Sequence, residues 1–112
     1  MNTSSFRLMR VLTAATLASC LGSLAQAQQQ SATQLHTRAT AAMCANCHGT
    51  DGRTTEGSAI PSLVGMPKDY MILQMKAFKD GSRPATVMHQ ITKGLTDAQI
   101  DTIASYYATT KR

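Results

Sequence analysis

The sequence predicts a small all-α domain. Three stretches repeat apolar residues at helical spacing, and none shows the alternation or the β-branched run that is typical of a strand. A length of 112 residues leaves room for one domain, and two Phe, three Tyr and no Trp supply little aromatic volume for its core. So small a core is marginal by itself, and a buried prosthetic group would supply much of the missing apolar volume.

The first predicted helix runs from about residue 32 to residue 44. Its apolar side chains share one face: Leu35, Ala39, Ala42 and Met43. The second covers Lys68–Asp80 and ends at Gly81, with Met71, Met75 and Phe78 on one face.

A short helix is expected within residues 86–91 and ends by Gly94. The sequence Thr96-Asp97-Ala98-Gln99 then has the pattern of a capping box, which begins the last helix. The predicted buried face of that helix consists of Ile100, Ile103, Ala104 and Tyr107.

Residues 1–27 have the three parts of a secretory signal peptide. Arg7 and Arg10 give a basic start, residues 11–24 are uncharged and largely apolar, and Ala25-Gln26-Ala27 is an A-x-A cleavage site. The apolar stretch is too short for a permanent membrane span. Cleavage would leave a flexible lead over residues 28–34 and a domain over residues 35–112. The signal peptide also predicts a periplasmic location.

One alternative concerns Cys20. The sequence Leu17-Ala18-Ser19-Cys20 resembles a bacterial lipobox, in which Cys20 would be lipidated and would anchor the protein to the membrane. Removal with the signal peptide is the favoured interpretation, because the apolar stretch continues past Cys20 and a good cleavage site follows.

Residues 44–49 read C-A-N-C-H-G, the C-x-x-C-H pattern of covalent haem c attachment. On a helical turn Cys44 and Cys47 lie on one face, so both thiols can reach the two vinyl groups on one edge of a porphyrin. His48 would then face the iron. A His ligand leaves the opposite coordination position to another part of the chain.

Three other interpretations of this motif are weaker. A thioredoxin-like redox pair would follow a strand in a βαβ pattern, and no such strand precedes it. A zinc site would need a second cluster of ligands, whereas Cys20, His36 and His89 are scattered singly. A chance match is disfavoured by the export signal.

The segment over residues 60–65 is short, apolar and interrupted by Pro61. An iron-bound His usually donates its second ring nitrogen to an acceptor that fixes its orientation. A backbone carbonyl near Pro61 is a good candidate for that acceptor, although the segment could also be a connecting turn with Leu63 in the core.

The charge of the chain is modest once the signal peptide is removed. The formal net charge of +5 includes Arg7 and Arg10, and without them nine Lys and Arg face six Asp and Glu, which gives +3. Haem propionates would lower this value further. Nucleic-acid binding has no support, whereas a modest positive rim for an acidic redox partner remains open.

From about residue 41 to residue 108 the sequence resembles a class I c-type cytochrome. It has the C-x-x-C-H motif, then P-x-L-x-G from Pro61 to Gly65, then a Met before a capped final helix. Within that class it is similar to the cytochrome subunits of flavocytochrome c sulfide dehydrogenases. That similarity lies in Tyr70, Gln74, the run Phe78-Lys79-Asp80-Gly81-Ser82-Arg83, Thr86-Val87-Met88 and Lys93-Gly94.

The resemblance implies three main helices and a short one wrapped around one haem c, with the first and last helices crossing at small Ala residues and Tyr107. It implies an electron-transfer protein that is not itself an enzyme. Its partners would be redox proteins, such as a sulfide-oxidising flavoprotein dehydrogenase and a terminal oxidase or another cytochrome. The alternative is a catalytic or gas-binding haem protein with a labile sixth ligand.

Five residues compete for that sixth position: Met66, Met71, Met75, Met88 and His89. Met71 and Met75 fit the core better than the ligand position. Met66 follows the segment of Pro61 too closely to reach round the porphyrin. Met43 is set aside because it adjoins the motif on the side of His48. Met88 lies far enough beyond His48 to reach the other face of a porphyrin. His89 has the same reach, but Met88 matches the ligand position of the family, so Met88 is the expected ligand and His89 a residue of the crevice rim.

Overall fold

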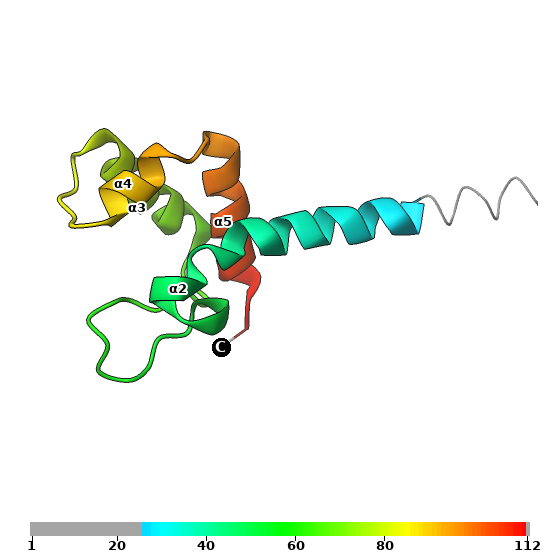
Figure 1. Ribbon diagram of the computed structural model, residues 1–112, viewed down its shortest axis with the longest axis horizontal. Coiled ribbons are helices and arrows are strands. Elements are labelled where there is room, and N and C mark those ends of the chain that lie inside the picture. The colour runs from blue at the N-terminus through cyan, green and yellow to red at the C-terminus, as the bar shows by residue number, and fades with distance from the viewer. Residues whose placement is uncertain (1–25, 112) are drawn as a thin grey trace, which may run out of the picture. The chain divides into compact units, whose positions relative to one another are not determined.

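The computed structural model of the protein describes residues 26–111 (Figure 1). The predicted all-α fold is confirmed, because these residues form helices and turns and include no strand. The predicted signal peptide and Cys20 lie outside the described residues, apart from residues 26 and 27. Between residues 26 and 111, no helix is long and apolar enough to cross a membrane.

The chain divides after Leu35 into two compact units. In the first unit, residues 26–35 are helical and exposed. The second unit, His36–Arg112, begins with helical residues 36–42. The helix therefore starts earlier than the expected residue 32, because the Gln- and Ala-rich residues before it are good helix formers. The flexibility of residues 28–34 stays a prediction, but their conformation here is helical.

Helix α3 (Lys68–Asp80) has both of its predicted bounds. Asp69 in its first turn and Lys79 in its last turn complement the helix dipole, and Gly81 ends it in the left-handed conformation (φ 85°). Met71 and Met75, one turn apart, are its buried residues, as the sequence predicted for core packing.

Helices α4 (Met88–Lys93) and α5 (Asp97–Thr109) follow in the expected places. The capping box at Thr96 is confirmed: the Gln99 N–H donates to Thr96 Oγ1 at 3.2 Å, and the Thr96 N–H donates to Gln99 Oε1 at 2.8 Å. In α4, the Thr92 hydroxyl is fully buried and donates to the carbonyl of Met88 at 2.8 Å. This bond ties the end of the short helix to its first residue.

The core lies where α3 packs against α4 and α5. The face of α5 predicted to be buried is confirmed, since Ile100, Ile103, Ala104 and Tyr107 are each at most 1% exposed. Burying an aliphatic side chain of this size contributes roughly 1.5–3 kcal/mol. The side of α5 that faces the core is therefore the main apolar surface of the domain.

Tyr107 also joins α5 to the end of the first helix. Its hydroxyl donates to the carbonyl of Ala41 at 2.7 Å, and both residues are buried. Their contact confirms the expected crossing of the first and last helices at small Ala residues and Tyr107. Burial raises the pKa of Tyr107 well above its usual value, so the hydroxyl keeps its proton and remains a donor at any physiological pH.

Replacing Tyr107 by Phe is expected to lower the free energy of unfolding of the holoprotein by about 1 kcal/mol, because the buried carbonyl of Ala41 loses a donor. Denaturant unfolding followed by circular dichroism measures the change. Tyr70→Phe is the control, since Tyr70 is 49% exposed, and it should change the free energy by less than about 0.5 kcal/mol. Equal effects of the two substitutions would contradict the structural role of this bond.

Candidate functional site

Cys44, Cys47 and His48 lie together on one helical turn. Helix α2 (Ala45–His48) begins after its N-cap residue Cys44, and the N–H groups of Cys47 and His48 both donate to the Cys44 carbonyl, at 3.3 and 2.9 Å. Both cysteines are free thiols, Cys44 half-buried and Cys47 exposed. Burial raises the pKa of the Cys44 thiol, against the lowering effect of the nearby Tyr107 hydroxyl. The motif therefore presents two free thiols and one imidazole.

The imidazole of His48 is held by the segment that the sequence indicated. His48 is buried, and its Nδ1 lies 2.7 Å from the carbonyl oxygen of Pro61. A carbonyl can only accept, so this bond places a proton on Nδ1 and leaves Nε2 as the nitrogen that could bind a metal. The predicted acceptor near Pro61 is confirmed, and the bond orients the ring as in a metal ligand.

A single backbone carbonyl holds the segment that carries Pro61. The carbonyl of Gly52, at the end of the short 3₁₀ helix η1 (Thr50–Gly52), accepts from the Ser62 hydroxyl at 2.8 Å, the Leu63 N–H at 2.8 Å and the Val64 N–H at 3.3 Å. Further along, the Gly65 N–H donates to the carbonyl of Tyr107 at 2.9 Å. The position of Pro61 therefore depends on Gly52 and on α5.

Two glycines of this loop have no room for a side chain. At Gly49 (φ 79°) a Cβ would lie 2.0 Å from the carbonyl oxygen of Arg53. At Gly52 (φ 75°) it would lie 2.7 Å from two carbons of the Tyr107 ring. The backbone turns sharply after His48, and the ring of Tyr107 packs directly on that turn.

Polar contacts fasten the same loop to the end of α5. Asp51 is in the left-handed conformation (φ 53°) and accepts from the Tyr106 hydroxyl at 3.1 Å. Arg53 forms an ion pair with Asp51 at 3.5 Å and donates to the carbonyl of Lys111. Tyr106 also meets Tyr107 edge to face, with ring centroids 5.0 Å apart. Sequence reasoning missed the hydrogen bonds from Tyr106 to Asp51 and from Arg53 to Lys111, because each joins residues more than fifty positions apart.

The candidates for the sixth ligand differ in burial. Met71 and Met75 are 3% and 6% exposed within the core, whereas Met88 is half-buried at the first position of α4. His89 is half-buried too, and its Nδ1 is buried without a hydrogen-bond partner among the described residues. The sequence predicted His89 only as a residue of the crevice rim. No residue near His89 in the sequence predicts that its Nδ1 lacks a hydrogen-bond partner.

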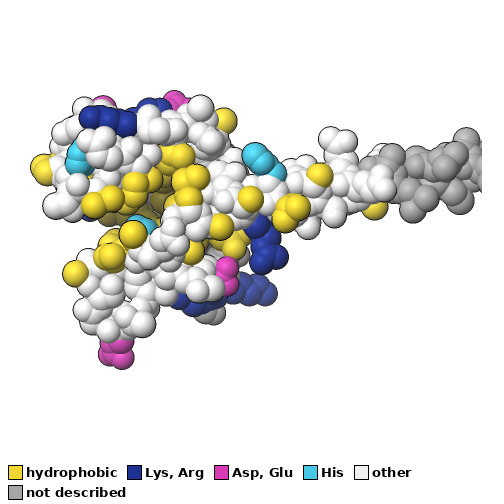
Figure 2. Space-filling model, in the orientation of Figure 1, with side chains coloured by type: hydrophobic (Ala, Val, Ile, Leu, Met, Phe, Trp, Pro, Cys, Tyr) yellow, Lys and Arg dark blue, Asp and Glu magenta, His cyan; other side chains and the backbone are white. Residues whose placement is uncertain are grey.

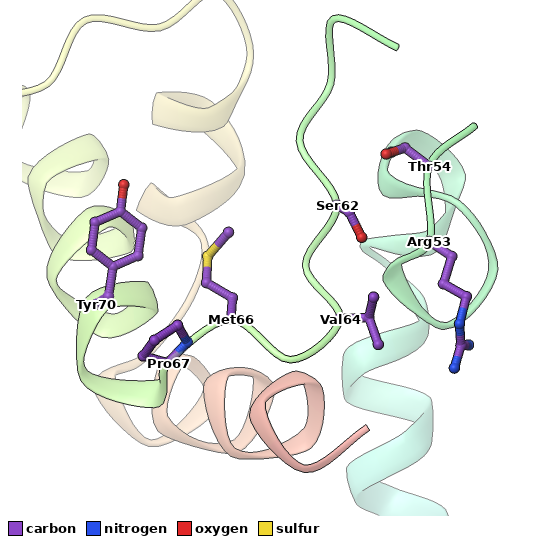
Figure 3. Close-up of a pocket in the computed structure, with 7 residues that line it drawn as sticks. All are labelled: Arg53, Thr54, Ser62, Val64, Met66, Pro67 and Tyr70. Carbon is purple, nitrogen blue, oxygen red and sulfur yellow. The ribbon is translucent and has the colours of Figure 1, made fainter. Parts of the chain in front are cut away.

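Met66 lines a pocket with a volume of about 610 Å³. In Figure 3 its thioether points into the space between Tyr70 on α3 and Ser62 on the loop. The residues that line this pocket include neither the cysteines of the motif nor His48 or Met88. The structure thus places Met66 beside the segment of Pro61, as the sequence indicated.

The described residues contain no group of three or more His, Cys, Asp or Glu side chains that could hold a metal ion, so the zinc interpretation finds no support within residues 26–111. The donor set instead fits a porphyrin: two free thiols on one helical turn and an oriented imidazole. Figure 2 shows a hollow between the part of the surface at α4 and the part at α2, with hydrophobic side chains on both sides of it.

Comparison with known proteins supports this interpretation. A family model described as cytochrome c matches residues 36–111. The cytochrome subunit of sulfide dehydrogenase from Chlorobaculum tepidum is 45% identical over 64 residues, which are 57% of this chain and 56% of that protein. A thiosulfate dehydrogenase electron acceptor from Thiomonas intermedia is 38% identical over 71 residues, which are 63% of this chain and 33% of that protein.

With a shorter relative, the match spans more of that protein's length. Cytochrome c-554(548) from Halomonas halodenitrificans is 38% identical over 68 residues, which are 58% of this chain and 81% of that protein. By contrast, the chain spans about half of the sulfide dehydrogenase subunit and about a third of the thiosulfate dehydrogenase electron acceptor.

Gly52→Ala is expected to lower the free energy of unfolding of the holoprotein by about 2 kcal/mol more than Gly57→Ala. Both glycines have positive φ (75° and 79°), so both substitutions strain the backbone, but a Cβ at Gly57 would meet nothing within 4 Å. The difference reports the crowding of this Cβ against the Tyr107 ring and against Leu63 Cβ, which would lie 3.0 Å away, and overpacking of this kind costs about 1–3 kcal/mol. Chemical unfolding of the two variants measures it, and equal losses would show that Tyr107 does not press on this turn.

Proposed function

We propose, from the premise that this chain belongs to the cytochrome c family, that it is an electron-transfer protein with one covalently bound haem c and His/Met axial ligands. The family implies covalent haem c. A single haem is proposed because the sequence contains one C-x-x-C-H motif. The observation that carries the proposal is the bond from His48 Nδ1 to the Pro61 carbonyl, directly beside two free thiols.

Cys44 and Cys47 are proposed to hold the haem through thioether bonds, and His48 to bind the iron through Nε2. Bound there, haem c would supply a one-electron Fe(III)/Fe(II) couple. The Pro61 carbonyl keeps the proton on Nδ1 and fixes the plane of the ring, which makes the imidazole a stronger donor. His48 is buried, so water has little access to its imidazole.

Met88 is proposed as the second axial ligand. It is half-buried at the start of α4, and the buried Thr92 hydroxyl anchors its backbone carbonyl. Met71 and Met75 are committed to the core. His89 is the main alternative ligand, since its buried Nδ1 has no hydrogen-bond partner in the described part of the chain. A thioether ligand would raise the reduction potential relative to a second imidazole.

The protein is proposed to pass electrons between partners and not to catalyse a reaction by itself. Two relatives are named as a subunit of sulfide dehydrogenase and as an electron acceptor of thiosulfate dehydrogenase. A flavoprotein dehydrogenase that oxidises sulfide is therefore the proposed donor, and a terminal oxidase or another cytochrome the proposed acceptor. The predicted signal peptide over residues 1–27 supports a periplasmic location.

Replacing both Cys44 and Cys47 by Ala is expected to abolish covalent haem, because both thioether bonds are lost. The readout is haem staining after denaturing electrophoresis of protein expressed with a haem c maturation system. Asn46→Ala, which alters the same helical turn but no thiol, should stain like the wild type. Normal staining of the double Ala variant would refute the proposed function as a whole.

Met88→Ala is expected to remove the weak near-infrared sulfur-to-iron charge-transfer band of the oxidised protein and to let carbon monoxide shift the Soret band of the reduced protein. His89→Ala is the matched control and should change neither signal. If His89→Ala opens the site and Met88→Ala does not, His89 is the ligand. If carbon monoxide shifts the Soret band of the wild-type protein at once, the sixth position is labile and the gas-binding alternative holds.

A further inference from the structure

Helix α4 contains the proposed ligand Met88 but is too short to be stable by itself. It has six residues, Met88–Lys93, and an isolated helix of this length does not persist in water. No side chain caps its first turn, since the N-cap residue is Val87, and no acidic residue complements the helix dipole there. The position of Met88 therefore depends on contacts made further along the helix.

The other end of α4 is firmly held. The Leu95 N–H donates to the carbonyl of Thr92 at 3.1 Å. Leu95 is buried in the core, and its own carbonyl accepts from Nζ of Lys79 on α3 at 2.6 Å. The end of α4 is thus tied both to the core and to α3, whereas its beginning lacks a comparable attachment of its own.

Thr92 is the residue through which α4 enters the interior. Among the six residues of α4, all of which the structure describes, only Thr92 is buried, and it is 0% exposed. Because no part of this side chain is exposed, haem binding would not change its burial. A buried hydroxyl needs a hydrogen-bond partner within the protein.

That partner is the first residue of α4. Oγ1 of Thr92 donates to the carbonyl of Met88 at 2.8 Å and lies 3.5 Å from the carbonyl of His89. The Thr102 hydroxyl makes the same kind of bond, to the carbonyl of Ala98 at 2.9 Å, and such bonds are common in helices. Two features distinguish Thr92: its hydroxyl is fully buried, and the carbonyl that it holds belongs to the proposed ligand.

We propose that Thr92 is a positioning residue for the axial ligand: its buried hydroxyl holds the backbone of Met88 and thereby keeps the thioether on the iron. A helical backbone restricts the rotamers of a Met side chain, so the place of the backbone decides where the sulfur can reach. Without the hydroxyl, the uncapped first turn of α4 would open more often, and an added ligand would compete better for the iron. This inference rests on the proposed function, with Met88 as the ligand.

Two variants at Thr92 separate the hydrogen bond from the packing. Thr92→Val nearly keeps the shape of the side chain and removes the hydroxyl, whereas Thr92→Ser keeps the hydroxyl and removes the methyl group. Thr102→Val is the matched control, because it removes the same kind of bond from α5, where Thr102 is half-buried. Each variant is prepared as holoprotein, and its free energy of unfolding is measured beside that of the wild type.

The probe is imidazole, titrated into the oxidised holoprotein. Its nitrogen replaces the thioether sulfur on the iron without a change of oxidation state, and the loss of the near-infrared sulfur-to-iron band reports the exchange. We expect Thr92→Val to bind imidazole about fivefold more tightly than the wild type, the effect of one hydrogen bond of ordinary strength. Thr92→Ser and Thr102→Val should bind it within about twofold of the wild type.

A purely structural role of Thr92 predicts a different order of the variants. Loss of a buried methyl group leaves a cavity, so Thr92→Ser would then raise the imidazole affinity at least as much as Thr92→Val. That order, or equal affinities of Thr92→Val and the wild type, would overturn the role of Thr92 and leave the proposed function intact. Failure of the proposed function is a separate result, seen as absence of the near-infrared band in the wild type or its survival in Met88→Ala.

Discussion

The contact that the rest of the structure depends on is made by one tyrosine. The hydroxyl of Tyr107 holds the carbonyl of Ala41 at the end of the first helix, and its ring lies against Gly52 after the motif. Its own carbonyl accepts from Gly65. One buried side chain on α5 therefore fixes the helix before the motif, the turn after it and the segment that returns past it. In a domain with so few aromatic residues, no other side chain of this size is fully buried among the described residues.

From this contact the orientation of His48 follows by short steps. Tyr107 packs on Gly52, the carbonyl of Gly52 holds residues 62–64, and these place the Pro61 carbonyl on His48 Nδ1. Each step is a short hydrogen bond or a tight packing contact, so the imidazole has little freedom. In the proposed one-electron carrier this would matter, because an iron ligand that does not move between oxidation states keeps the reorganisation of the site small.

The basic side chains of α3 are directed toward α5. Basic residues of α3 form ion pairs with α5, while residues 43–48, 57–66 and 84–92 include no Lys, Arg, Asp or Glu. Exposed ion pairs contribute little to stability.

The sequence by itself determined the cofactor motif, the bounds of α3, the capping box of α5 and its buried face, because these depend on residue spacing within a few turns of one helix. It also indicated the acceptor of His48, since Pro61 interrupts a short apolar segment. Only the tertiary structure decided that Gly52 is the acceptor that holds this segment, that Asp51 meets Tyr106, and that His89 has an orphan nitrogen. These features arise between residues far apart in the chain, where side-chain packing and the direction of backbone carbonyls decide which groups meet, and no local pattern encodes either.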